Sequence, residues 1–121
     1  MTGSMSYKDL IAWKKAMDFV VYVYEAIKSL PDNEKYGLAS QMKRAAVSIP
    51  SNIAEGHGRN LKKVFSNHLS IALGSLMELE TQIELSQRFD YIPKEKAIAL
   101  LATSKELAKI IYGLQDSIKP N

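Results

Sequence analysis

The sequence predicts an all-α protein, an antiparallel up-down-up-down four-helix bundle. Four long segments carry apolar residues at steps of three and four, the spacing of one face of an amphipathic helix. The breaks between them are short and fall at proline, glycine and asparagine residues. No stretch alternates in the manner of a strand, and no internal repeat is present. Helices of roughly 23 to 29 residues, about 35 to 43 Å long and joined by short turns, fold back on one another.

The first predicted helix runs from Lys8 to Leu30. Its predicted core-facing stripe consists of Leu10, Trp13, Met17, Val20, Tyr24 and Ile27. Further apolar residues at 21–23 widen the arc, which predicts a second buried contact on this helix. Residues 31–33, Pro-Asp-Asn, end the helix and supply a cap for the next one.

The second predicted helix runs from Glu34 to Glu55 or Gly56. Its core-facing stripe consists of Leu38, Met42, Ala45, Ile49 and Ile53. Pro50 lies inside this helix. Because proline lacks a backbone donor and clashes with the carbonyl four residues earlier, it predicts a kink. Residues 56–58, Gly-His-Gly, predict a helix C-terminal cap followed by a turn.

The third predicted helix runs from Leu61 to Phe89, with Asn60 as its N-cap. Its stripe consists of Phe65, Leu69, Ala72, Leu76, Leu79 and Ile83, a heptad-like pattern suited to near-parallel packing. Gly74 and Ser75 interrupt the helix with small side chains that would let another backbone approach closely.

The fourth predicted helix begins at Pro93, a favoured first-turn residue, and continues to Ile118. Its stripe consists of Leu100, Leu107, Ile111, Leu114 and Ile118, with Ser104 in the remaining position.

The four helices are predicted to form one domain over residues 6–119, preceded at residues 1–5 by a cloning remnant. The chain has no cysteine and no apolar run near the roughly 18 residues of a membrane span. We therefore expect no membrane association and a cytoplasmic location.

A polar stripe on the second helix is the most informative feature of the chain. Arg44, Ser48, Asn52, Glu55 and Arg59 recur at steps of four, four, three and four, so they share one helix face. Serine and asparagine are mediocre helix formers, and a solvated face usually carries lysine and glutamate. The stripe is therefore predicted to contact something, either as a hydrogen-bonded packing and subunit interface or as part of a phosphate-binding surface.

The charges divide the sequence into two zones. Residues 43–63 hold five basic residues against one acid, and residues 78–90 hold four acids against one base. The basic zone predicts a nucleic-acid contact made by Lys43, Arg44, Arg59, Lys62 and Lys63. The alternative is that the two zones neutralise each other, between neighbouring helices or between subunits. If the polar stripe is a hydrogen-bonded packing surface, Arg44 or Arg59 pairs with Glu55 or with a carboxylate of the third helix such as Glu78.

The residues for an enzyme or a bound cofactor are missing from the sequence. His57 and His68 have no carboxylate or second histidine three or four residues away, so a bundle-type metal site is not predicted. No nucleophile elbow, phosphate loop or dinucleotide fingerprint is present. We therefore predict no catalytic residues, no metal, no cofactor and no small-molecule substrate.

The sequence resembles a known family along most of residues 7–92. The likeness is carried first by Gly37-Leu38-x-x-Gln41-Met42-x-Arg44-Ala-Ala-Val-Ser-Ile-Pro-Ser-Asn-Ile-Ala-Glu-Gly56, followed by Gly58-Arg59. It is also carried by Tyr7-x-x-Leu10-x-x-Trp13, Leu30-Pro31-x-x-Glu34-x-Tyr36 and Leu69-x-Ile71-Ala72-x-Gly74-Ser75-Leu76-x-Glu78-Leu79-Glu80. These motifs resemble the bacterial four-helix-bundle proteins often encoded within intervening sequences of 23S ribosomal RNA genes. The resemblance implies a homo-oligomer, a ring-like pentamer, with a link to RNA or the ribosome and no catalytic residues.

The function predicted from these observations is that of a non-enzymatic homo-oligomer whose assembled basic surface binds structured RNA without sequence specificity. The alternative is a protein-interaction scaffold that binds no nucleic acid. In that alternative, the polar stripe serves only subunit packing, and a neighbouring copy neutralises the basic zone.

Overall fold

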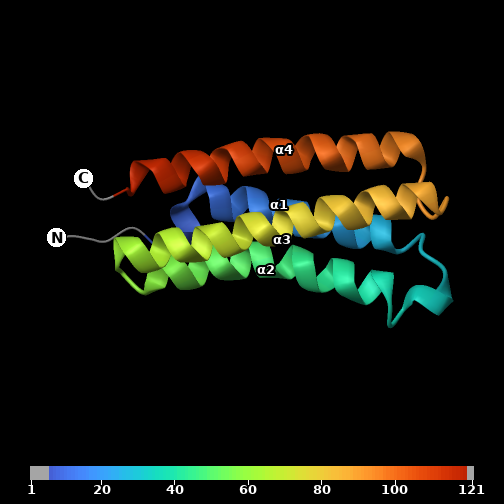
Figure 1. The fold of residues 1–121 in the computed structure, drawn as a ribbon, viewed down its shortest axis with the longest axis horizontal. Helices are drawn as coiled ribbons and strands as arrows, with labels where there is room; N and C mark the ends of the chain where they lie inside the picture. Colours follow the sequence, from blue (N-terminus) through green and yellow to red (C-terminus); the bar gives the residue numbers. More distant parts are fainter. Residues whose placement is uncertain (1–5, 120–121) are drawn as a thin grey trace.

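The computed structural model describes residues 6–119 and contains four α-helices (Figure 1). They are α1 (Ile11–Ile27), α2 (Leu38–Gly58), α3 (Lys62–Arg88) and α4 (Lys94–Ser117), with short 3₁₀ turns η1 (Tyr7–Asp9) and η2 (Asp32–Glu34). Residues 6–119 hold no strand, so the predicted all-α class is confirmed. Residues 1–5, predicted to be a cloning remnant, lie outside the described part of the chain.

The helices form an antiparallel bundle in which each helix packs against two neighbours. The neighbouring pairs are α1 with α2, α2 with α3, α3 with α4, and α4 with α1, and no diagonal pair is in contact in the described residues. The α1–α2 side of the bundle is therefore opposite the α3–α4 side. The start of α1 and the end of α4 lie at the same end of the bundle as the turn between α2 and α3 (Figure 1). No helix in residues 6–119 is long and apolar enough to cross a membrane.

The predicted core stripes of α2, α3 and α4 are confirmed. Met42, Ile49 and Ile53 of α2 are fully enclosed, and every residue of the predicted α3 stripe is buried. On α4 the buried positions are Leu100, Ser104, Leu107 and Ile111, while Leu114 and Ile118 pack against the edge of the core. Burial of such side chains from water is the main favourable contribution to the stability of a bundle.

The predicted core stripe of α1 is correct only in part. The residues that α1 buries are Ala12, Ala16, Phe19, Val23, Ala26 and Ile27, so Ile27 is the one residue of the predicted stripe that is fully in the core. Leu10, Trp13 and Val20 are partly buried at the core edge, whereas Met17 and Tyr24 are exposed. The helix carries two adjacent apolar stripes. The bundle buries the one rich in alanine, because small side chains let neighbouring helices approach closely.

The turn between α2 and α3 lies further along the chain than residues 56–58, where the two glycines predict it. Gly56 and Gly58 are part of α2, and the chain reverses at Asn60, whose φ of 60° is in the left-handed region. Asn60 was predicted as the N-cap of α3, but Leu61 occupies that position and makes no side-chain capping bond. Asparagine tolerates the left-handed conformation better than most residues, which explains its place in the turn.

At Gly56 the side chains of α3 lie close against the backbone of α2. A methyl group at this position would lie 2.5 Å from Cβ of His68 and 3.1 Å from a ring carbon of Phe65. Gly74, predicted to admit a neighbouring backbone, has nothing within 4 Å of a Cβ placed there and is exposed.

Pro50 is buried inside α2. The kink expected there stays a prediction.

The opposite end of the bundle is fixed by Glu34. The predicted second helix begins four residues late, at Leu38, because residues 32–34 form the 3₁₀ turn η2. One carboxylate oxygen of Glu34 accepts the Leu38 N–H at 3.1 Å, and the other accepts the Tyr91 hydroxyl at 2.9 Å. Ser29 donates to the Tyr91 carbonyl at 2.9 Å. These bonds join the α1–α2 connection to the α3–α4 turn.

We predict that Gly56→Ala lowers the free energy of unfolding by about 1 to 3 kcal/mol, because the new methyl group overpacks the α2–α3 contact. Gly113→Ala is the matched control: nothing lies within 4 Å of a Cβ at that helix position. There the change should raise stability by about 0.5 to 1 kcal/mol, through the better helix propensity of alanine. Urea denaturation measures both. Equal effects of the two substitutions would contradict the close approach at Gly56.

We also predict a loss of stability at alkaline pH that depends on Tyr91. Its hydrogen bond to the Glu34 carboxylate, together with desolvation and the charge of Glu34, raises the pKa of the Tyr91 hydroxyl. A raised pKa stabilises the fold below the unfolded value of about 10, and this contribution disappears as the pH rises through the folded pKa. Thermal melts of the wild type and Tyr91→Phe across pH 8–12 should converge at the alkaline end.

Candidate nucleic-acid interface

The polar stripe of α2 faces α3 within the same chain. Ser48 Oγ and Ser75 Oγ lie 2.9 Å apart. Asn52 donates from Nδ2 to the carbonyl and hydroxyl oxygens of Ser48, at 2.9 and 3.0 Å. The Asn52 Oδ1 atom then accepts a bond of 2.9 Å from His68 Nδ1. The polar atoms in the middle of the stripe are therefore satisfied by α3 and by the stripe itself.

At its C-terminal end the stripe reaches solvent through Glu55. Its Oε2 atom lies 3.1 Å from Arg59 Nη2 and 3.9 Å from His68 Nε2. Arg59 and Glu55 are both about half exposed, so this pair contributes at most about 1 kcal/mol to stability. The sequence left open whether Arg59 pairs with Glu55 or with a carboxylate of the third helix, and in the structure it pairs with Glu55.

Arg44, the first residue of the stripe, is exposed and forms no salt bridge or hydrogen bond in the described part of the chain. It lines a shallow pocket of about 160 Å³ between α2 and α3, together with Gln41, Ser48, Ser75 and Glu78. The alternative pairing of Arg44 with Glu78 is therefore not formed, although both line the same pocket.

The predicted phosphate-binding residues do not lie on one compact patch. The ammonium group of Lys43 lies over the Tyr24 ring, 5.5 Å from its centroid, on the side of α2 that faces α1. Lys62 and Lys63 are the first two residues of α3, at the other end of the bundle. Sixteen residues of helix separate Lys43 from Arg59, which corresponds to about 24 Å. The five residues are predicted as one surface only because they lie close together in the sequence.

Net charge nevertheless concentrates at one end of the bundle. The half that holds the α2–α3 turn comprises residues 6–19, 48–75 and 106–119 (Figure 1). It carries eight lysines and arginines against five aspartates and glutamates. The remaining half, residues 20–47 and 76–105, carries eight of each and is neutral. Arg59, Lys62 and Lys63 belong to the basic half, whereas Lys43 and Arg44 belong to the neutral half.

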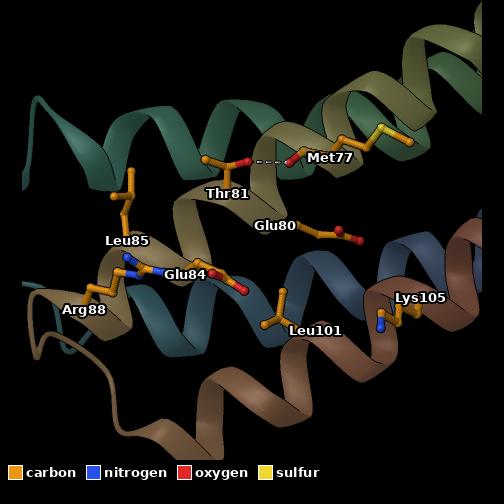
Figure 2. Close-up of a pocket in the computed structure, with 8 residues that line it drawn as sticks. All are labelled: Met77, Glu80, Thr81, Glu84, Leu85, Arg88, Leu101 and Lys105. Carbon is orange, nitrogen blue, oxygen red and sulfur yellow. Dashed lines mark hydrogen bonds between the residues drawn. The ribbon is translucent and has the colours of Figure 1, made fainter.

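A groove between α3 and α4 was missed by the sequence reasoning (Figure 2). It encloses about 570 Å³, and its apolar lining comes from Met77, Leu85 and Leu101. The charged and polar lining residues are Glu80, Thr81, Glu84, Arg88 and Lys105. Beneath it, the buried Ser104 donates a hydrogen bond to Glu80. The sequence held a signal, because 77, 81, 84 and 88 recur at heptad-like steps outside the core stripe.

The described residues contain no group of three or more histidine, aspartate and glutamate side chains placed to hold a metal ion. His57 packs edge-on against Phe65, with ring centroids 5.5 Å apart, and His68 belongs to the polar network. Both histidines therefore have structural surroundings in this chain.

Comparison with known proteins places the chain in a family. Residues 8–113 match the family model described as 23S rRNA-intervening sequence protein. The chain belongs to this family. A solved structure from the S23 ribosomal protein family, a Bacteroides thetaiotaomicron VPI-5482 protein of unknown function, aligns with a TM-score of 0.80 at 27% sequence identity. The alignment covers 87% of this chain and 98% of that one. Curated proteins give no match.

The match to the 23S rRNA-intervening sequence family extends from the turn before α1 to the last part of α4. It therefore includes the whole polar stripe, its partners His68 and Ser75 on α3, and the α3–α4 groove. The sequence analysis had not identified His68 and Ser75 as partners of the stripe. Their spacing of seven places both on one face of α3, beside the core stripe, which is the signal that could have found them.

We predict that Asn52→Ala destabilises this member of the family by about 1 to 3 kcal/mol, because the substitution removes the acceptor of the partly buried His68 Nδ1. Arg44→Ala is the control on the same stripe. Its side chain is exposed and makes no polar bond in residues 6–119, so its effect should stay within about 0.5 kcal/mol. Chemical denaturation followed by circular dichroism measures both. A larger effect at Arg44 than at Asn52 would show that the stripe depends on another partner.

Proposed function

We propose that this protein is a non-enzymatic, cytoplasmic homo-oligomer that binds structured RNA without sequence specificity, through the basic half of its bundle. The observation that carries the proposal is the uneven charge distribution: the entire net charge of +3 lies in the half that holds the α2–α3 turn. Cationic side chains bind RNA mainly by neutralising phosphates and releasing counterions, which requires no base-specific contact.

Two features of the basic half support phosphate binding. Lys62 and Lys63 are exposed in the first turn of α3, where the helix dipole also favours an anion. Arg59 follows directly from α2 and is about half exposed beside Glu55. The names of the two related families, which refer to 23S rRNA and to a ribosomal protein, are consistent with an RNA partner.

Self-association supports the proposal by multiplying this charge. One copy with a net charge of +3 generates a weak field, whereas several copies in a ring present several basic ends together. Exposed apolar side chains on both outer sides of the bundle, such as Val21, Val47 and Ile98, are typical of subunit contacts. The number five rests on the family resemblance alone.

The test is a titration of structured RNA at several salt concentrations. The logarithm of affinity should fall linearly with the logarithm of salt concentration, by about 0.7 to 0.9 for each phosphate engaged. In Lys62→Glu/Lys63→Glu, affinity near 50 mM salt should fall at least about tenfold and the salt slope should become shallower. The double variant Lys94→Glu/Lys96→Glu is the matched control, since it makes the same charge change on exposed residues of the neutral half.

Equal losses in the two double variants would show that overall charge, not the basic half, determines binding. No binding by the wild type near 50 mM salt would contradict the RNA proposal and leave the protein-interaction scaffold as the function. Sedimentation of each variant shows whether assembly is unchanged.

A further inference from the structure

Two exposed apolar surfaces lie on opposite sides of the bundle. The α1/α2 face consists of the exposed side chains Met17, Val21, Tyr24 and Val47, together with Lys43. The α3/α4 groove lies on the other side and is extended along α4 by Ile98, which is 57% exposed. Since each helix contacts only its two neighbours in residues 6–119, neither surface is covered by another part of the described chain.

A cation on the α1/α2 face and a carboxylate in the groove lie at the same height along the bundle axis. Ser48 and Ser75 are in contact across α2 and α3, which run antiparallel. Lys43 lies five residues before Ser48 and Glu80 five residues after Ser75, so both are displaced equally in the same direction. By the same reasoning, Val47 and Met77 differ in height by about one residue, or 1.5 Å.

Both charges lack an opposite partner within the described residues. Lys43 contacts the Tyr24 ring and forms no salt bridge. Glu80 accepts the Ser104 hydroxyl, but neither Glu80 nor Glu84 forms a salt bridge. Figure 2 shows these two carboxylates in the middle of the groove, with Arg88 and Lys105 towards its two ends. The middle of the groove therefore suits a surface that presents one cation among apolar side chains.

We propose that the α3/α4 groove of one copy holds the α1/α2 face of a second copy. In this arrangement the two bundles lie side by side, with their axes parallel and pointing the same way. Lys43 of the second copy then meets Glu80 of the first, and Val47 of the second copy meets Met77 of the first. This contact joins two different surfaces, so it is heterologous, and each copy of the pair keeps its other surface for a further copy. It rests on the self-association included in the proposed function and identifies the surfaces that make it.

Two variants block one surface each. Val21→Glu/Val47→Glu places carboxylates on the α1/α2 face, and Met77→Glu/Ile98→Glu places them in the groove. Each pair changes exposed side chains, so the bundle itself should remain folded, which circular dichroism and melting temperature check. Transfer of a carboxylate into an apolar contact is unfavourable, so each variant should lose its assembly.

A heterologous contact predicts that the two blocked variants rescue each other. Each alone should have the mass of a single chain by sedimentation. Mixed in equal amounts, they should form a dimer of one copy of each, because the first variant has an intact groove and the second an intact α1/α2 face. Native mass spectrometry identifies the two chains in the dimer. Ile71→Glu, on an exposed position of α3 at the side facing α2, is the control and should assemble like the wild type.

Several outcomes would overturn the inference. If either blocked variant still assembles alone, the contact does not need both surfaces. If the mixture stays monomeric while the wild type assembles, the surfaces do not bind each other. A monomeric wild type would remove the assembly part of the proposed function as well. A failure of RNA binding with assembly and rescue intact would overturn only the RNA proposal.

Discussion

The close contact between α2 and α3 is the constraint on which the rest of the bundle depends. At Gly56 the two helices come so near that even a methyl group would clash with His68. Further along, Ser48 and Asn52 of α2 meet Ser75 and His68 of α3 through hydrogen bonds of 2.9 Å. Small side chains allow the approach, and polar side chains in register then favour one relative position of the two helices.

This contact also decides which residues are available for function. The centre of the polar stripe is bonded to α3, so its serine and asparagine are not free to bind a ligand or another subunit. The cations at the end of α2 and the start of α3 remain exposed, in the half of the bundle that carries the net charge. The phosphate binding that we propose is therefore a property of the basic end, which includes Arg59, and not of the middle of the stripe.

The α3–α4 pair is built differently. Ser104 occupies a core position and donates to Glu80, which brings a carboxylate to the edge of the core beside an open groove. A bundle could fill this space with a larger apolar residue, and an exposed groove with apolar walls suits a partner. These are the two sides of the molecule that we propose to associate, with Lys43 on one side at the height of Glu80 on the other.

The sequence by itself determined the all-α class, the number of helices and the core stripes of α2, α3 and α4, because each of these helices has one dominant apolar face. It also predicted polar contacts for the stripe, and the structure shows them for Ser48, Asn52, Glu55 and Arg59 but not for Arg44. The core face of α1 was decided only by the tertiary structure, since that helix carries two apolar stripes and packing selects the alanine-rich one. The partners of the stripe and the division of charge between the two ends likewise depend on which helices become neighbours. Periodicity describes one helix at a time, and only the packed bundle sets distances between residues far apart in the chain.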